Sequence, residues 1–201
     1  GFWPKQVKMY VENKEAYFQI MDDVVRAAEA NHVGIIADLF WCNFAVSDVV
    51  GEHLDQWGNP DSKTIAFMKQ YVADVVGRYK DSPAIFAWEM GNEYNLGFDL
   101  PYDHSGPYPA GWLPPTYTDL GCPATRDPYH DFWDHETGIF AFKAFAAEVR
   151  KYDPYRLLIT GNSAPRGGAW HNSYNNSWQT DTRAQFDEIL LRDNPDPINT
   201  I

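Results

Sequence analysis

The sequence of 201 residues predicts an α/β fold built on a parallel sheet. Short apolar runs with strand character alternate with segments of helical periodicity, which is the pattern of βαβ units. Links from helix to strand are short, whereas links from strand to helix are long, at 42–61, 94–134 and 162–180. Long loops at one edge and tight turns at the other indicate a (β/α)8 TIM barrel, whose active site lies at the carboxyl ends of its strands.

The predicted helices rest on apolar residues that recur three and four positions apart. They cover Tyr17 to Ala28, Ile65 to Tyr79, Ile139 to Tyr152 and, more briefly, Thr182 to Arg192.

The predicted strands lie between these helices, and each is a short apolar run. They are Val33 to Trp41, Ala84 to Met90, Arg156 to Gly161 and a last one that begins at Pro197 and stops at Ile201. Four strands are too few to close an eight-stranded barrel. We therefore expect residues 1–201 to form a single domain that is a partial barrel, holding about strands 2 or 3 to 6.

A doubly wound nucleotide-binding fold is the competing architecture. It is weakened because no strand is followed by a Gly-x-Gly-x-x-Gly or P-loop pattern.

Charge and composition limit the classes of partner. The 16 Lys and Arg against 28 Asp and Glu give a net charge of −12, which argues against nucleic acid and against an anionic membrane surface. No apolar run is long enough for a membrane span. Aromatic residues make up 16% of the chain, and many lie in the predicted loops, where flat rings suit either sugar faces or protein interfaces.

The chain has two cysteines, Cys42 and Cys122. Two are too few for a disulfide scaffold and lack the spacing of a metal site. Both follow predicted strand ends, so a disulfide between them and a pair of free thiols both remain open.

Residues Trp88 to Tyr94 contain the most informative motif. A buried apolar run ends there and places Asn92 and Glu93 where the predicted strand meets an open loop. A carboxylate at the tip of a core strand combines rigidity with access, as catalysis requires. The structural alternative makes Glu93 a cap or ion-pair residue and Asn92 a turn former.

The segment from Lys80 to Glu93 resembles the fourth-strand signature of retaining glycoside hydrolases with (β/α)8 barrels, in particular the cellulases and β-mannanases of glycoside hydrolase family 5. The segment from Asp153 to Thr160 is similar to the usual lead into the fifth strand of that family. The resemblance covers most of the chain in pattern, but its only specific motif is the one that contains Asn92 and Glu93.

The resemblance implies a retaining O-glycoside hydrolase that acts on β-linked polysaccharide, of the β-mannan or β-glucan type, with no cofactor. It makes Glu93 the general acid/base and Asn92 the partner of the sugar 2-hydroxyl. The family's nucleophile, a glutamate on the seventh strand, is expected beyond Ile201. The chain would thus supply half of an active site in a protein that is secreted or periplasmic, and alone it would be inactive.

Glu89 is the obvious second carboxylate, but its spacing excludes it as nucleophile. Four residues along a strand span roughly 13 Å, whereas retaining pairs lie about 5–5.5 Å apart and inverting pairs about 6.5–9.5 Å apart. We expect Glu89 to be a structural carboxylate paired with a cation.

Further residues are candidates for substrate contacts, each with packing or turn formation as the alternative. They are Trp41, Asn43, Trp112, Asn162, Trp170 and His171. Trp112 is the favoured sugar-stacking residue in the loop 94–134, which also carries Tyr94, Tyr102, Tyr108, Tyr117, Tyr129 and Trp133.

Two other interpretations remain. A metal site at Asp127, His130, Asp131, Asp134 and His135 is weak, because the two histidines are five apart and favourable helix-start acids explain Asp131 and Asp134; we predict no metal. A catalytically inactive carbohydrate-binding barrel is the main alternative function. A barrel lyase or aldolase is disfavoured because no predicted strand ends in lysine.

Overall fold

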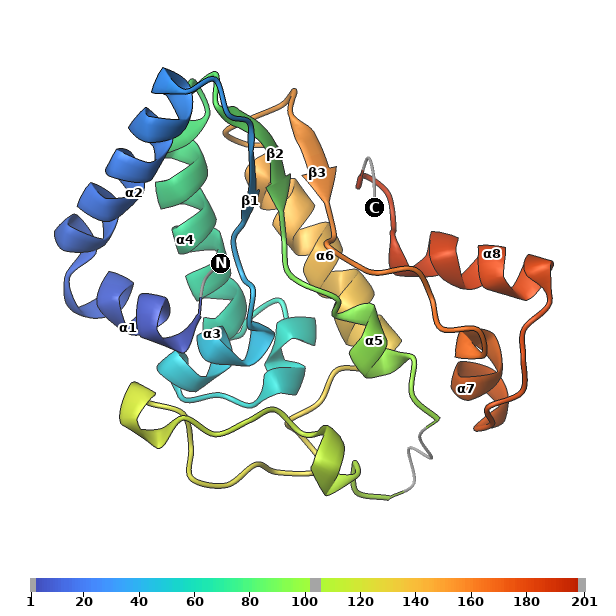
Figure 1. The fold of residues 1–201 in the computed structure, drawn as a ribbon. Helices are drawn as coiled ribbons and strands as arrows, with labels where there is room; N and C mark the ends of the chain where they lie inside the picture. Colours follow the sequence, from blue (N-terminus) through green and yellow to red (C-terminus); the bar gives the residue numbers. More distant parts are fainter. Residues whose placement is uncertain (1–2, 102–105, 199–201) are drawn as a thin grey trace.

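The computed structural model describes residues 3–101 and 106–198 (Figure 1). Its strands are β1 (Ile35–Asp38), β2 (Ile85–Glu89) and β3 (Leu157–Ile159). Its α-helices are α1 (Pro4–Glu12), α2 (Lys14–Ala30), α3 (Asn43–Val50), α4 (Lys63–Tyr79), α5 (Asn95–Phe98), α6 (His135–Val149), α7 (Ala169–Asn175) and α8 (Arg183–Asp193). Short 3-10 turns are η1 (Leu54–Gly58), η2 (Ala110–Trp112) and η3 (Thr118–Leu120).

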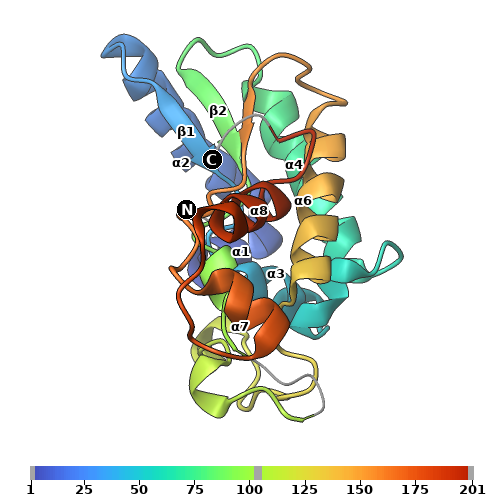
Figure 2. The ribbon, with the colours of Figure 1, turned by 90° about the vertical axis from the view of Figure 1, so that its right-hand side faces the viewer.

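The three strands form one parallel sheet in the order β1-β2-β3. Asp38 lies opposite Glu89, and Glu89 lies opposite Ile159. The carboxyl ends of all three strands therefore meet at one edge of the sheet. Helices α4 and α6 pack on each other and cover one face of the sheet, as the side view shows (Figure 2).

Local sequence explains where the long helices begin. The side chain of Asn13 accepts a hydrogen bond from the backbone N–H of Ala16 at the start of α2, and Ser62 and Asp134 do the same for α4 and α6. Thr182 and Gln185 form a reciprocal capping box at the start of α8. Such caps satisfy backbone donors that have no partner inside the helix.

The core lies between the sheet and α4 and α6. Trp88 from β2, Met68 from α4 and Phe142 from α6 are completely buried. The indole of Trp88 donates to Asp153, 2.9 Å away. Burial alone would raise the pKa of Asp153, but hydrogen bonds from Trp88 and Arg156 outweigh it and lower this pKa to about 2.

The predicted mixed α/β fold with a parallel sheet is confirmed, and so are the first three strands and the four helices, with shifted ends. The described residues form three strands and no closed barrel. Pro197 and Ile198 lie in a turn and an irregular segment, and the rest of the predicted last strand, 199–201, lies outside the described residues. The prediction missed α1, and it treated the segments of α3, α5 and α7 as loop.

Candidate active site

The turn after β2 holds the Asn92-Glu93 motif at the carboxyl edge of the sheet. Backbone hydrogen bonds continue past the end of β2, from Met90 to Ile159 at 3.0 Å, from Gly91 to Thr160 at 3.2 Å and from Glu93 to Gly161 at 2.8 Å. The turn is thus fixed to the segment that follows β3.

Two residues of this turn region have positive φ. Gly161 has a φ of 78°, and a Cβ there would lie 1.7 Å from the carbonyl oxygen of Gly91, so only glycine fits. Glu93 has a φ of 54°, a left-handed conformation that is unfavourable for a side chain of this kind. Its backbone position is therefore imposed by the surrounding structure.

The Glu93 pocket is a pocket of ≈ 200 Å³ beside this turn. Glu93 is exposed at its wall. Of the residues predicted to contact substrate, Asn43 at the start of α3 and Trp112 in the long loop also line it. The other lining residues are Leu54, Tyr94, Gly97, Tyr108, Pro114, Asp131, Phe132 and Trp133.

The long loop that forms the outer wall of this pocket is held in place by specific contacts. Arg126 makes two hydrogen bonds to the carboxylate of Asp48 in α3, at 2.6 and 2.9 Å, and both side chains are almost fully buried. The ring of Tyr108 stacks on Phe132 with centroids 4.9 Å apart, and its hydroxyl donates to the carbonyl of Gly97 at 2.7 Å. The wall is therefore preorganised.

Two predicted substrate contacts lie near the turn but do not line the pocket. Asn92 is partly exposed immediately before Glu93. Trp41 is 36% exposed and stacks on Trp3 with ring centroids 6.1 Å apart. A role of either in substrate binding stays a prediction.

The residues predicted beyond β3 lie in a separate hydrogen-bonded cluster. Asn162 is buried, accepts from the backbone of Asn95 and donates to the backbone of Asp193 at 2.8 Å. The ring of His171 contacts Asp181 at 2.7 Å, and the indole of Trp170 donates to Glu188 at 3.1 Å. The side chains of Asn162, Trp170 and His171 thus have protein partners in the structure. Their roles in substrate binding stay predictions.

Two aromatic residues of the long loop line the Glu93 pocket but are mostly buried in the core. Tyr94 is 7% exposed and Trp133 is 5% exposed, and their rings meet edge to face at 4.8 Å. The loop is rich in Pro and Gly and contains many Tyr and Trp residues. Its sequence does not show which of these rings anchor the loop and which face the pocket. Burial against Phe142 of α6 decides it.

The expectation of a cation beside Glu89 is wrong for the described part of the chain, where no ion pair to Glu89 forms. Its neighbour across the sheet is another carboxylate, Asp38. Burial raises the pKa of Glu89, and burial followed by the charge of Glu89 raises the pKa of Asp38 to about 7.

Cys42 and Cys122 are both free and both buried, which is the free-thiol alternative. Burial is the main reason that the pKa of Cys42 rises to about 12 and that of Cys122 to about 11. Neither thiol is therefore a nucleophile near neutral pH.

Histidines and acids of the weak metal hypothesis have other partners. His130 contacts Asp55 at 2.8 Å, Asp131 accepts from the backbone of Leu54 at 3.2 Å, and Asp134 caps α6. Over residues 3–101 and 106–198, no group of three or more His, Cys, Asp or Glu side chains is placed to hold a metal ion. No helix in this part of the chain is long and apolar enough to cross a membrane.

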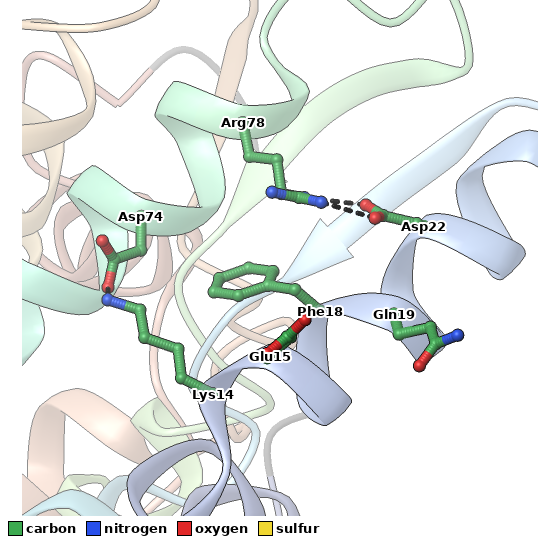
Figure 3. A pocket seen from close by; sticks show the side chains of 7 residues that line it. All are labelled: Lys14, Glu15, Phe18, Gln19, Asp22, Asp74 and Arg78. Atoms are coloured by element: carbon green, nitrogen blue, oxygen red, sulfur yellow. Dashed lines mark hydrogen bonds and ion pairs between the residues drawn. The ribbon is translucent and has the colours of Figure 1, made fainter.

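A larger hollow of ≈ 670 Å³ lies between α2 and α4 and shares no residue with the Glu93 pocket (Figure 3). Four of its five charged side chains are paired with each other. Lys14 forms an ion pair with Asp74, and Arg78 donates to Asp22 at 2.7 Å. This hollow is a surface groove between two helices.

Comparison with known proteins points to one kind of enzyme. Over 123 residues the chain is 32% identical to a probable mannan endo-1,4-beta-mannosidase C of Aspergillus terreus, which is 54% of this chain and 29% of that protein. Over 81 residues it is 38% identical to a probable mannan endo-1,4-beta-mannosidase F of Aspergillus flavus and 36% identical to a mannan endo-1,4-beta-mannosidase A of Podospora anserina. Those stretches are 37% of this chain and 17% and 21% of the two relatives.

The similarity is modest and partial. The matched stretches span less than a third of these relatives, at 29%, 17% and 21% of their lengths. No family model matches the chain. Part of the chain is thus similar to fungal mannan endo-1,4-beta-mannosidases.

Eight of the eleven residues that line the pocket are not among the predicted catalytic or substrate-contact residues, and three of the eight are Leu54, Asp131 and Phe132. Leu54, Asp131 and Phe132 come from segments that are apart in sequence and are joined by a backbone hydrogen bond from Asp55 to His130 at 2.9 Å. The sequence carries no periodic signal for such a loop-to-loop contact. Of these three, the sequence singles out only Asp131, as an acid at a predicted helix start.

Proposed function

We propose that this chain is part of a retaining O-glycoside hydrolase that acts on β-mannan, with Glu93 as the general acid/base. The similarity to mannan endo-1,4-beta-mannosidases supports the substrate class, and the fourth-strand motif supports the residue. The three-stranded sheet is then an arc of a (β/α)8 barrel, and the edge that carries Glu93 is its catalytic edge. We also propose that the protein acts outside the cytoplasm, where its polysaccharide substrate is found.

One observation carries the assignment of Glu93. This residue has the strained left-handed conformation, its backbone N–H is fixed to Gly161, and its side chain is exposed at the wall of a pocket. Neither a cap nor an ion pair uses the carboxylate in the described residues. Strained backbone that presents an unused polar group to a pocket is a feature of functional sites.

The chemistry assigned to Glu93 has two proton transfers. The carboxylic acid of Glu93 donates a proton to the glycosidic oxygen as the bond between this oxygen and the anomeric carbon breaks. A nucleophilic carboxylate forms a covalent bond to the anomeric carbon in the same step. The carboxylate of Glu93 then removes a proton from the water that attacks the anomeric carbon and releases the nucleophile. Glu89, which lies inside β2, is not assigned as that nucleophile.

Substrate binding is assigned around the same turn. Asn92 would donate to the 2-hydroxyl of the sugar beside the scissile bond, and Asn43 and Trp112 would contact neighbouring sugar units in the pocket. Trp112 is 39% exposed and meets Tyr108 edge to face at 5.8 Å, so one ring face is held in a fixed orientation. Fixed aromatic faces bind sugars at low entropic cost.

The test is hydrolysis of β-mannan by the full-length protein and by its Glu93→Gln variant. The amide keeps the size of the side chain but has no proton to give, so we expect the rate to fall about 10²- to 10⁴-fold. Glu12→Gln, at an exposed position of α1, is the matched control and should leave the rate unchanged. Binding of mannan without hydrolysis by the unaltered full-length protein would instead establish a carbohydrate-binding function.

A further inference from the structure

A second polar cluster lies where α6, α7 and α8 meet. Helix α8 packs against both α6 and α7 (Figure 2). His135 is the first residue of α6, Ser173 lies in α7 and Asp193 is the last residue of α8. The three helices therefore bring a histidine, a serine and an aspartate that are far apart in sequence to one place in the fold.

The contacts within this cluster have the order nucleophile, base and orienting acid. The hydroxyl oxygen of Ser173 lies 2.7 Å from Nε2 of His135. Nδ1 of the same ring lies 3.2 Å from Oδ1 of Asp193, whose side chain is 1% exposed. A carboxylate accepts a hydrogen bond from Nδ1–H, and in this tautomer the lone pair of Nε2 is on the side of the serine. This is the arrangement by which serine hydrolases activate their nucleophile.

The protonation state of His135 also suits a base. Burial lowers the pKa of His135 below its usual value, the hydrogen bond to Asp193 opposes this effect, and the charge of Arg192 adds to it. The imidazole is therefore neutral near pH 7, and the neutral ring is the form that can accept a proton.

Arg192 brings a positive charge to the serine. Its Nε donates to Asp193 at 3.0 Å, and its Nη2 lies 2.7 Å from Nε2 of His135 and 3.4 Å from the hydroxyl oxygen of Ser173. Its Nη1 donates to the hydroxyl of Tyr174 at 3.4 Å. A guanidinium in this position can stabilise the negative oxygen that develops when the serine attacks a carbonyl carbon.

The hydroxyl of Ser173 has two acceptors within reach. It donates to the carbonyl oxygen of Ala169, one turn earlier in α7, at 2.8 Å, which is a common contact of serine in a helix. Because Nε2 of His135 is equally near, rotation about the Cβ–Oγ bond moves the hydrogen from one acceptor to the other. An ester oxygen that draws Nη2 of Arg192 away from the imidazole would leave Nε2 to the serine.

The cluster borders a pocket of ≈ 430 Å³, here named the α6–α8 pocket. Its lining residues are Asp134, His135, Glu136, Ile139, Ser173, Tyr174 and Arg192, none of which lines the Glu93 pocket. The two acidic residues in the wall disfavour an anionic ligand, and Ile139 provides apolar surface. The lining therefore suits a short acyl group attached to an uncharged alcohol.

We propose that Ser173, His135 and Asp193 form a second active site, which hydrolyses esters of short-chain carboxylic acids with uncharged alcohols. Ser173 is the nucleophile, and His135 is the general base and acid. Asp193 is a positioning residue that orients the imidazole, and Arg192 stabilises the oxyanion. This activity goes beyond the proposed glycoside hydrolysis and does not depend on it.

The reaction has two steps. Oγ of Ser173 bonds to the acyl carbon while its proton passes to Nε2 of His135, and the bond from the acyl carbon to the alcohol oxygen then breaks as His135 returns the proton to that oxygen. Water next gives a proton to His135 and attacks the acyl carbon, and the serine leaves with the proton of the imidazole. The sum is ester and water giving carboxylic acid and alcohol.

The direct test is covalent labelling of the full-length protein with a fluorophosphonate, which bonds to the oxygen of an activated serine with loss of fluoride. We expect mass spectrometry to find the adduct on Ser173, and we expect the labelling rate to fall at least about 10²-fold in His135→Gln. Ser177→Ala, two residues past the end of α7, is the matched control and should label like the parent. A parent protein without an adduct on Ser173, or equal labelling rates for the parent and His135→Gln, would overturn the proposal.

Turnover is measured with p-nitrophenyl acetate. Ser173→Ala should lower kcat/KM at least about 10²-fold and leave hydrolysis of β-mannan unchanged. Asp193→Asn favours the wrong tautomer of His135 and should lower kcat by about 10²- to 10⁴-fold with little change in KM; an unchanged kcat would overturn its positioning role. Equal ester hydrolysis by the parent and Ser173→Ala would contradict the second active site, whereas inactivity of the parent on mannan would count only against the proposed function.

Discussion

The two long connections at the carboxyl edge of the sheet differ in what their polar side chains do. After β2, Glu93 is exposed at a pocket and its carboxylate has no partner in the described residues. After β3, Asn162 and His171 are buried and bonded to Asp193 and Asp181. Both connections contain residues that the sequence marked as candidate site residues. Two connections that both follow strand ends therefore differ in the hydrogen-bond partners of their candidate site residues.

The connections after β2 and β3 also differ in their effect on the free energy of the fold. The β3 connection satisfies its buried polar groups, which stabilises the segment that carries α7 and α8. The β2 connection keeps a glutamate in a left-handed conformation, which costs about 1–2 kcal/mol. We interpret the first as structure and the second as strain retained for function.

The largest expected effect on stability is in the β3 connection. Asp181 accepts from the ring of His171 at 2.7 Å and from the backbone of Trp170 at 2.9 Å, and its side chain is 1% exposed. Asp181→Ala should lower the free energy of unfolding by about 2–3 kcal/mol, because these buried donors lose their acceptor. Urea unfolding measures this. A loss of kcat/KM with unchanged stability would show instead that the cluster belongs to the active site.

A smaller change in free energy is expected for substrate binding in the Glu93 pocket. Trp112→Ala should raise KM for mannan about 5- to 10-fold with little change in kcat, because a stacking face binds ground state and transition state alike. Trp178→Ala removes a ring that is 61% exposed and does not line the pocket, and is the matched control. Equal KM values for the two variants would remove Trp112 from the binding site.

The smallest expected effect on stability is at Glu93 itself. Glycine carries no penalty in the left-handed region, so Glu93→Gly should stabilise the protein by about 0.5–1 kcal/mol while it abolishes hydrolysis. His32→Gly is the control, since His32 has nearly the same φ, 55° against 54°. His32 lies at the opposite end of the sheet, in the turn before β1, and its replacement should stabilise without loss of activity. Destabilisation by Glu93→Gly would mean that the carboxylate has a structural role.

Much of the fold could be predicted from periodicity. The apolar stripes that predict α4 and α6 are buried in the structure at residues such as Met68 and Phe145, whereas the stripe of α2 is buried at Tyr17 but exposed at Ile20 and Val24. The short helices could not be predicted in this way. Helix α3 begins at Asn43 and packs on α4, so its formation depends on tertiary contacts more than on an amphipathic pattern.

The sequence could predict the candidate site residue that follows a strand end. It could not predict the residues that contacts between loops bring to the pocket. Glu93 follows directly from the end of β2. Asp131 reaches the pocket because the segment 127–131 is bonded to η1 and to the residue before it. Contacts between residues so far apart in sequence leave no local pattern. The placement of Asp38 opposite Glu89 likewise depends on strand register, which the sequence did not specify.

The role of Glu93 is tested most directly by the dependence of the Glu93→Gln variant on the leaving group. Hydrolysis rates of the full-length protein are compared for β-mannan and for an aryl β-mannoside whose phenolate leaves without protonation. The account predicts a loss of about 10²- to 10⁴-fold on mannan and a much smaller loss in formation of the glycosyl-enzyme from the activated aryl glycoside. Equal losses on both substrates would contradict the assignment of Glu93 as the acid.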